Sequence, residues 1–413
     1  MANIKPFQAY RPSPGLEQQI AALPYDVYNR QEATDIVKEN PGSFLAIDRA
    51  ETGFSADVDT YDERVYDRAN ELLRSWIAEG RFIQEDKPCY YLYEQTFQGR
   101  KQTGIVACAS IDEYQQNIIK KHENTRADKE ADRIHHVDTC SMQTGPIFLA
   151  YRAQEDINQL IATVKTQNAP IYDFVSEDGI GHKVWLVAED TRIQQITEAF
   201  QKIPALYIAD GHHRCASAVK VGIKRREQYP GYTGAEEFNS FLSVIFADSE
   251  LAIMDYNRVV KDLNGLSQEE FLSKIQESFL LKEVPGQVTP AAKGLFGMYL
   301  DGKWYELQAK PEICSEDAVA GLDVSILQDY LLGPILGIQD PKTDKRIDFV
   351  GGIRGLQELE KRVHTDMQIA FSMHPTSMAE LLAVADAARL MPPKSTWFEP
   401  KLRSGLFLHE IER

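Results

Sequence analysis

The sequence predicts a mixed α/β fold of the α+β class, and three observations lead to this prediction. Hairpin patterns occur at residues 89–111 and 297–307, where apolar runs flank short polar turns. Strands followed directly by helices recur between them, as at residues 205–229. The 413 residues are 43% hydrophobic, which is enough for a large core and for two or three domains. Hairpins mixed with strand–helix units are typical of α+β architecture.

The N-terminal part begins with a helix and a hairpin. Residues 59–80 carry an apolar stripe at helical spacing that includes Val65, Leu73 and Trp76, with Gly80 as the expected stop. The first hairpin is expected to turn at residues 98–102. Further strands are expected at 146–152, 183–189, 205–210 and 240–248, and helices at 124–140, 156–165, 191–200 and 212–229. We therefore expect an N-terminal α/β region over residues 1–264.

The C-terminal part, residues 265–413, carries clear local signals. Ser267 and Glu270 form a capping box, which predicts a helix over 268–279. Asp301 and Gly302 predict the turn of the second hairpin. Further helices are expected at 322–337, 356–363 and 378–390, and strands at 345–352, 367–373 and 404–411. These signals predict a second α/β region, with a proline-rich strap at residues 388–407.

Composition and motif content argue against several classes of protein. The net charge of −17 disfavours nucleic acid and anionic membranes as partners. The five cysteines are scattered without a CxxC pair, which argues against a disulfide framework and a zinc knuckle. The sequence contains no signal-peptide pattern, long apolar run, P-loop, GxGxxG, HExxH or nucleophile elbow. We expect a cytoplasmic protein with small-molecule partners, and the sequence leaves homo-oligomer formation open.

The stretch ALYIADGHHRCASA contains the first candidate site, where a strand passes directly into a helix. The N–H groups and positive dipole end of the helix would meet His212, His213 and Arg214 at this turn. A phosphate suits these donors, and Gly211 allows close backbone approach. Asp210 is the one acceptor there, able to orient a hydroxyl, bind Mg²⁺ or cap the helix. A plain capped turn and zinc ligation by the adjacent histidines are the alternatives.

A second polar cluster lies at residues 120–136. Arg126, Lys129 and Arg133 fall on one face of the expected helix. His122 and Glu123 precede it, in the kind of loop where ligand-binding residues are often found. The alternative is a solvated helix laced by salt bridges, which is the usual explanation of a charge run.

Two further segments combine site-forming residue types with structural explanations. The strap contains three side chains of types that bind anions, Lys394, Ser395 and Thr396. The alternative is that the strap is a packed structural segment. Near the N-terminus, polar residues open a helix and bracket a short strand; they are turn formers first, with a site contribution as the alternative. These residues are Tyr25, Asp26, Arg30, Ser43, Asp48 and Arg49.

Several long blocks of the sequence resemble one family. They are LPYDV, NPGSFL, KKHENTRADKEADR, PIFLAY, YIADGHHR and MPPKSTWFEPKLRSGL, and they run from about residue 5 to the C-terminus. On these blocks the chain is identified as a member of the uncharacterised domain-of-unknown-function 1015 family, whose genes often lie near serine-biosynthesis genes. Locally, DGHHRCASA resembles the strand–turn–helix motif of the ParB/sulfiredoxin-like group, which includes the free-serine kinases. The likeness implies that Gly211, His213 and Arg214 contact nucleotide phosphates and that Asp210 lies beside a substrate hydroxyl.

The leading hypothesis is therefore a nucleotide-dependent phosphotransferase, similar to serine kinases, that acts on serine or a similar small hydroxyl compound. It would use ATP or ADP together with Mg²⁺, and no metal site made by the protein alone is predicted. Asp210 and Glu123 are the predicted catalytic residues. The predicted phosphate and nucleotide contacts are Gly211, His212, His213, Arg214, His122, Arg126 and Lys394. The alternatives are a phosphatase or nucleotidase using the same pocket, and a non-catalytic nucleotide-sensing regulatory protein.

Overall fold

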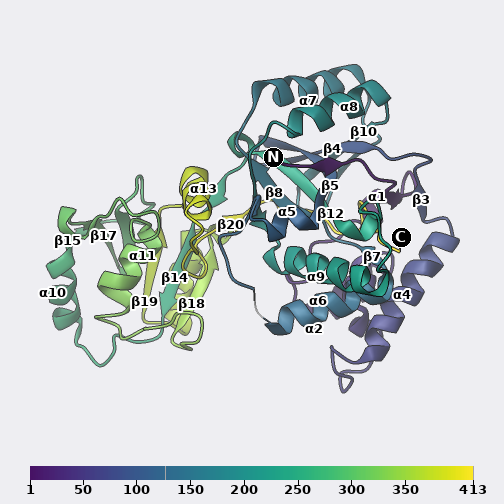
Figure 1. Cartoon of the computed structure of the whole chain (residues 1–413). Helices are drawn as coiled ribbons and strands as arrows, with labels where there is room; N and C mark the ends of the chain where they lie inside the picture. The colour runs from purple at the N-terminus through teal and green to yellow at the C-terminus, as the bar shows by residue number, and fades with distance from the viewer. Residues whose placement is uncertain (126, 413) are drawn as a thin grey trace. The chain divides into compact units, whose positions relative to one another are not determined.

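The computed structural model describes residues 1–125 and 127–412, and the chain forms two compact units (Figure 1). The first unit contains Met1–Leu251 and Pro400–Arg413, and the second contains Ala252–Glu399. The chain therefore leaves the first unit once, builds the second, and returns to the first with its C-terminal segment. The sequence predicted a different division, into residues 1–264 and 265–413, and that division into domains remains a prediction.

A nine-stranded mixed sheet forms the centre of the first unit. Its order is β6 (Ile119–Lys120), β11 (Leu206–Asp210), β8 (Ile147–Tyr151), β12 (Ser240–Ala247), β5 (Arg100–Ser110), β4 (Tyr90–Phe97), β10 (Gly181–Val187) and β9 (Tyr172–Val175), with β1 (Ile4–Lys5) also paired to β5. β8 is parallel to β12, and β11 is parallel to β6. The other neighbours are antiparallel. Every residue of β8 and β12 is buried, as expected for central strands.

Helices α7 (Glu155–Gln167), α8 (Asp190–Phe200) and α9 (His212–Gln228) pack on this sheet (Figure 1). Their apolar residues, among them Phe200 and Val219, form one core with strand residues such as Ile105, Leu149 and Phe241. Helix α6 (Ala127–Cys140) packs along α9. The start of α9 is therefore fixed by the sheet and by α6 together.

A second core lies among the N-terminal helices of the first unit. α2 (Arg30–Glu39), α3 (Leu45–Asp48) and α4 (Glu63–Ala78) enclose Phe44, Leu73 and Trp76, and α4 also packs on α6. Leu408 belongs to the same core, and β21 (His409–Glu410) pairs with β7 (Met142–Gln143). The C-terminal segment is thus an integral part of the first unit.

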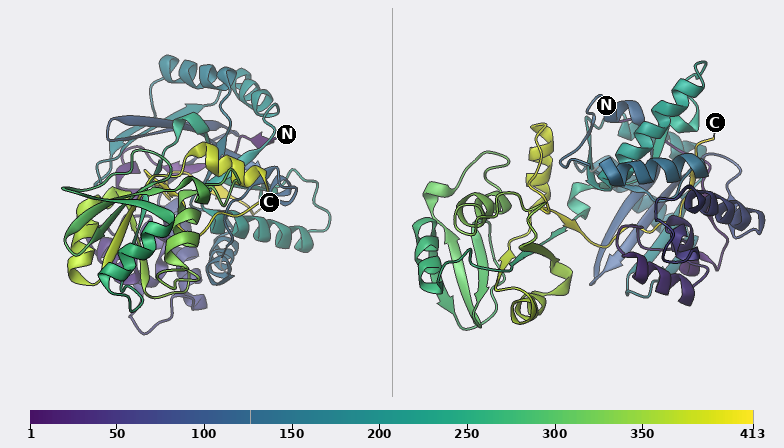
Figure 2. Two further views of the ribbon diagram at one scale, coloured as in Figure 1. Left: turned by 90° about the vertical axis from the view of Figure 1, so that its left-hand side faces the viewer. Right: turned by 90° about the horizontal axis from the view of Figure 1, so that it is seen from below.

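The second unit is built on a six-stranded antiparallel sheet. Its order is β15 (Phe279–Val284), β17 (Lys303–Ala309), β16 (Leu295–Leu300), β19 (Ile369–Met373), β14 (Tyr256–Val260) and β18 (Ile347–Gly351). Helices α10 (Gln268–Ser278) and α12 (Leu356–Thr365) pack beside it, and Figure 2 gives two further views of these strands and of α10. Val259, Trp304 and Leu359 belong to its core.

The expected α+β class and most local signals are confirmed. Across the turns of the two hairpins, Phe97 pairs with Arg100 and Leu300 pairs with Lys303. The capping box of Ser267 forms at the start of α10. Within residues 1–125 and 127–412, no helix combines the length and the apolar character that a membrane crossing requires.

Two C-terminal expectations differ from the structure. The helix expected over 322–337 consists of α11 (Asp323–Leu327) and a π-helical turn at Gln328–Leu332. Proline at position 334 explains the early end, because it lacks an N–H and disfavours helical geometry in the residue before it. The strand expected over 404–411 forms a ladder only at His409–Glu410, and Ser404 and Leu408 make isolated bridges with Ala22 and Tyr10. Gly405 has φ +81°, a left-handed conformation that interrupts an extended segment.

Candidate functional site

The strand-to-helix turn at Asp210 is the centre of the candidate site. β11 ends at Asp210 and α9 begins at His212, so Gly211 alone connects them. Gly211 has φ +90°, where a residue with a Cβ atom would be strained. Gly211 occupies the N-cap position, so Asp210 is not the capping residue that a plain capped turn would require. The first N–H groups of a helix have no partner within it, and here they begin beside Asp210.

Arg214 folds back over this turn from the first turn of α9. A Cβ atom on Gly211 would lie 3.1 Å from both Nε and Nη2 of Arg214, so glycine lets the guanidinium rest against the backbone. Nη1 of Arg214 donates a hydrogen bond of 2.5 Å to the carbonyl of Pro146. A Cβ atom on Gly145 would lie 3.6 Å from the same Nη1. The positively charged guanidinium of Arg214 therefore lies against both Gly145 and Gly211 at the N-terminus of α9.

Asp210 is held as a carboxylate by donors on both of its oxygens. Oδ1 accepts the N–H of Gly211 at 2.9 Å, and Oδ2 accepts the ammonium of Lys401 at 3.1 Å. Burial raises the pKa of Asp210, but the charges of Lys401 and Arg214 and these two hydrogen bonds outweigh burial and hold the pKa well below its ordinary value. The side chain is 33% exposed, so a ligand can still reach an ionised carboxylate.

His212 and His122 form a buried pair of rings beside Asp210. Their centroids are 4.5 Å apart and their planes are nearly perpendicular. The backbone N–H of His122 donates to Nε2 of His212 at 3.5 Å, which places the His212 proton on Nδ1, 3.8 Å from Oε2 of Glu123. Burial lowers the pKa of His212 to about 4 and, with the charge of His212, that of His122 to about 3. Both rings are neutral at pH 7 and offer hydrogen bonds rather than charge.

His213 lies among acidic groups. Burial lowers its pKa, whereas the charges of Asp26, Glu123 and Glu130 raise it. Its carbonyl accepts the hydroxyl of Ser217 at 2.7 Å within α9. Because a phosphate at this ring would meet the negative charge of three carboxylates, Arg214 is a stronger candidate for a phosphate contact than His213.

Two further predicted contacts are Arg126 and Lys394. Arg126 lies outside the described residues. Lys394 belongs to the second unit, where its ammonium lies 5.5 Å from the ring centroid of Tyr256 and its carbonyl accepts from Arg258. Among the described side chains, no group of three His, Cys, Asp or Glu is arranged to hold a metal ion.

Lys401 is the residue at Asp210 that sequence reasoning missed. It lies 191 positions from Asp210 in the chain, inside the segment MPPKSTWFEPKLRSGL. The composition of that segment indicated an anion contact and pointed to Lys394. Because Lys394 and Lys401 occupy similar proline-flanked positions, no local pattern distinguishes the lysine that reaches Asp210.

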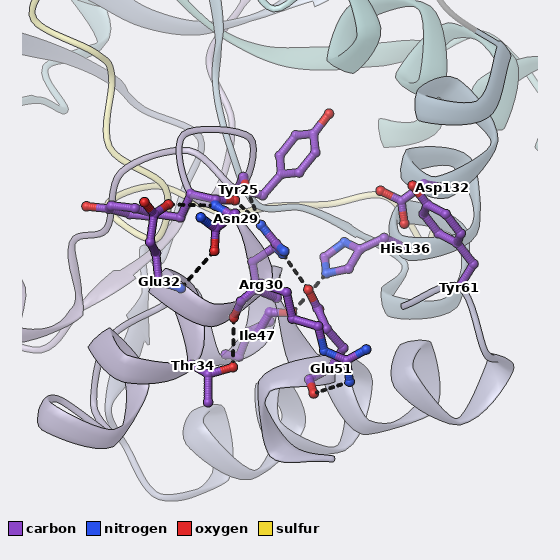
Figure 3. Close-up of polar contacts among 12 residues, drawn as sticks. Tyr25, Asn29, Arg30, Glu32, Thr34, Ile47, Glu51, Tyr61, Asp132 and His136 are labelled. Carbon is purple, nitrogen blue, oxygen red and sulfur yellow. Dashed lines mark hydrogen bonds and ion pairs between the residues drawn. The ribbon is translucent and has the colours of Figure 1, made fainter. Parts of the chain in front are cut away.

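Residues from the N-terminal segment and α6 enclose a polar cavity of about 220 Å³, which we call the N-terminal chamber. Tyr25, Asp48, Arg133 and His136 line the chamber and also line a second cavity that reaches Arg214. In Figure 3, Asp132 and His136 extend from α6, and His136 points toward Ile47. The sequence singled out Tyr25, Asp48 and Arg133, whereas His136 was only the last residue of the polar cluster at residues 120–136 and was given no role.

Comparisons with known proteins give a family and a set of distant structural likenesses. The model of the family described as "Protein of unknown function (DUF1015)" matches residues 4–325. No curated protein matches the chain. A free serine kinase in complex with AMP is 13% identical, with a TM-score of 0.37, and the match covers 73% of this chain and 91% of that one.

Two further solved structures show likenesses of the same order. SbnI with a C-terminal truncation, from Staphylococcus aureus, is 10% identical, with a TM-score of 0.37 and coverage of 72% of this chain and 85% of that one. A conserved hypothetical protein from Pyrococcus furiosus is 14% identical, with a TM-score of 0.34 and coverage of 72% and 93%. TM-scores of 0.34 to 0.37 assign no chemistry to this chain, so its chemistry is inferred from its own residues.

Proposed function

The chain belongs to the family described as "Protein of unknown function (DUF1015)", and from that premise we propose that it transfers a phosphoryl group between a nucleotide and a small hydroxyl compound such as serine. One observation carries the proposal: an ionised Asp210, held by Lys401, lies one residue before a glycine-opened helix over which Arg214 is folded. A phosphate-binding turn and a proton acceptor thus lie side by side. The strand–turn–helix likeness to the ParB/sulfiredoxin-like group, seen in the sequence, agrees with this proposal.

The N-terminus of α9 supplies the phosphate contacts. A helix N-terminus attracts anions through its unpaired N–H groups and its dipole, and the seventeen-residue α9 has a full dipole. Arg214 adds a permanent positive charge and several planar donors at the same place. In phosphoryl transfer, positioning and charge stabilisation supply most of the rate acceleration, and both are present here.

Asp210 acts on the acceptor hydroxyl. The hydroxyl oxygen bonds to the terminal phosphorus of the nucleotide as the bond from that phosphorus to its bridging oxygen breaks. The shortened nucleotide leaves with the electron pair, and the hydroxyl proton passes to the carboxylate of Asp210. Because the pKa of Asp210 is low, the carboxylate orients the hydroxyl and receives its proton late, when the oxygen is already bonding to phosphorus. Lys401 fixes the carboxylate in place.

The carboxylates of Asp210 and Glu123 fit a magnesium ion that is held jointly with nucleotide phosphates. Magnesium in such sites takes only one or two carboxylates from the protein and completes its octahedron with phosphate oxygens and water. When bound, the ion would neutralise negative charge on the phosphates.

A thermal-shift series on the full chain tests the proposed function. ATP and ADP are each added with and without Mg²⁺ and serine, and a nucleotide that binds the folded state raises the melting temperature. We expect a shift with one of them that is lost in R214A and kept in R192A, a matched arginine variant on α8. Turnover is then followed by ³¹P NMR of the phosphorylated hydroxyl product. If no nucleotide shifts the melting temperature, the proposal fails.

A further inference from the structure

The N-terminal chamber lies in the same unit as Asp210, and it shares wall residues with a smaller cavity beside Arg214. Tyr25, Asp48, Arg133 and His136 line both the chamber and the cavity that contains Arg214. The charge of Arg214 also acts on the Tyr25 hydroxyl, which confirms that the two lie near each other. A small molecule in the chamber would therefore contact side chains that also line the cavity containing Arg214.

Four of the seven described charged side chains that line the chamber form ion pairs with one another, and the other three are Asp26, Asp48 and Lys129. Nε of Arg49 donates to Oε1 of Glu51 at 2.6 Å, and its Nη1 donates to two backbone carbonyls. Nε of Arg133 donates to Oδ2 of Asp132 at 3.0 Å, and its guanidinium lies 4.0 Å from the ring centroid of Tyr25. These four side chains, Arg49, Glu51, Arg133 and Asp132, therefore line the chamber with hydrogen bonds already formed to protein groups.

Asp48 is the exception among the buried acids of the chamber. Its side chain is almost completely buried, and its Oδ1 accepts the Thr144 hydroxyl at 2.8 Å. It forms no ion pair with any side chain in residues 1–125 and 127–412, although the charge of Arg133 acts on it from a distance. A buried carboxylate without a cation is costly, so a ligand that brings a positive charge is favoured here.

His136 presents an unsatisfied acceptor. Its Nε2 lies 3.2 Å from the carbonyl of Ile47, and because a carbonyl only accepts, Nε2 must carry the proton (Figure 3). Burial and the charge of Arg133 lower the pKa of His136, so the ring is neutral and Nδ1 has a free lone pair. Nδ1 is buried, and it has no hydrogen-bond partner among the described residues. Only a ligand that donates hydrogen bonds satisfies it.

We propose that the N-terminal chamber binds the phosphoryl acceptor through a protonated amine, received by Asp48 and His136, so that the acceptor is an amino-hydroxyl compound. The inference rests on the proposed function and specifies its substrate class. Both groups accept hydrogen bonds, so the carboxylate of Asp48 and the unpartnered Nδ1 of His136 match the donors of an ammonium. The hydroxyl of such a compound would then be directed toward the wall that the chamber shares with the cavity of Arg214, the proposed phosphate contact.

Calorimetric titration of the full chain with three probes tests the substrate class. Ethanolamine carries an amine and a hydroxyl, L-serine adds a carboxylate, and 3-hydroxypropionate carries the hydroxyl and carboxylate without the amine. We expect ethanolamine or L-serine to bind and 3-hydroxypropionate not to bind. Binding of 3-hydroxypropionate without binding of either amine overturns the inference. This comparison uses the unsubstituted protein and does not depend on how any variant folds.

The variant D48N tests the residue assignment, with D35N as its control because Asp35 is an exposed acid on α2 of the same unit. We expect D48N to weaken amine binding at least tenfold and to leave the nucleotide-induced thermal shift unchanged. Amine binding that is equal in D48N and D35N overturns the assignment. If amines bind and nucleotides do not, the chamber assignment stands and the proposed phosphoryl transfer fails. If nucleotides bind and neither amine does, the chamber inference fails alone.

Discussion

At the scale of single residues, two aspartates of the first unit show how partners decide chemistry. Asp210 accepts from Lys401 and from the Gly211 N–H, so it is a fixed anion with one accessible side. Asp48 is more deeply buried, and its hydrogen-bond donor is the neutral Thr144 hydroxyl. The first is suited to orienting a hydroxyl, and the second is suited to receiving a cation. The same residue type thus has two roles within one unit.

Replacing Asp210 by Asn tests its proposed role. Asn retains an oxygen for the Gly211 N–H but removes the charge that pairs with Lys401. We expect turnover to fall by about 10²- to 10⁴-fold, the usual contribution of a positioned proton acceptor, while the nucleotide-induced thermal shift remains. D112N, which breaks the ion pair of Asp112 with Arg226 in the same unit, is the control. Equal turnover in D210N and D112N would contradict the assignment.

The buried pair of His122 and His212 predicts an acid-sensitive fold. Their folded pKa values, about 3 and about 4, lie below the unfolded value, so between these limits the unfolded state binds more protons. Stability is therefore complete above about pH 6.5 and falls as the pH is lowered. We expect H122F to flatten the dependence of melting temperature on pH between about 4.5 and 6.5. H135Q, at an exposed histidine of α6, should keep the wild-type slope; a wild-type slope in H122F would refute this account.

At the scale of elements, the turn from β11 to α9 is built by one backbone conformation. Gly211 reverses the chain in the left-handed region, which lets the helix start at once and lets Arg214 cover the turn. α9 then packs against the sheet and α6, so the direction of its N-terminus is set by two layers. The position of the turn is therefore set by the left-handed conformation of Gly211 and by the packing of α9 on the sheet and on α6.

Replacing Gly211 by Ala separates backbone strain from site geometry. G99A is the matched control, because Gly99 has φ +79° and its Cβ would meet nothing within 4 Å. Both variants should lose about 1 kcal/mol or slightly more in the free energy of unfolding, since both hold alanine in the left-handed region. In G211A the new methyl also displaces Arg214, so we expect the nucleotide-induced thermal shift to disappear only there. A shift that persists in G211A would show that Arg214 does not hold the ligand.

At the scale of the whole molecule, the path of the chain assembles the site. The chain leaves the first unit after residue 251, forms the second, and returns at residue 400. The returning segment brings Lys401 to Asp210 and places Arg403 against Asp178. The first unit is therefore completed only by residues that follow the entire second unit.

The second unit carries its own pH-dependent group, Asp323. Its Oδ1 accepts the Gly294 N–H at 2.9 Å, whereas Oδ2 is buried without a partner among the described residues. Burial and Glu380 raise its pKa to about 6, although Lys293 and His374 oppose this. Because the folded pKa lies above the unfolded one, a stability penalty develops as the pH rises from about 4 to 6 and persists above.

D323N removes that penalty and keeps the acceptor for Gly294. We expect it to stabilise the second unit by about 1–3 kcal/mol at pH 8 and to have little effect at pH 4. Hydrogen exchange of the amides in β16 and β17 measures this within the unit concerned. D340N, at an exposed acid of the same unit, should change neither value. Equal protection of D323N and wild type at pH 8 would contradict the prediction.

The sequence by itself determined the local features of this protein. It predicted the α+β class, both hairpins, the Ser267 capping box and the strand–turn–helix at Asp210, because each is specified by residues close together in the chain. Tertiary structure decided which groups meet: Lys401 at Asp210, the ring of His122 against His212, and the chamber around Asp48 and His136. These contacts depend on strand order and on the return of the C-terminal segment. Short-range patterns contain no information on either.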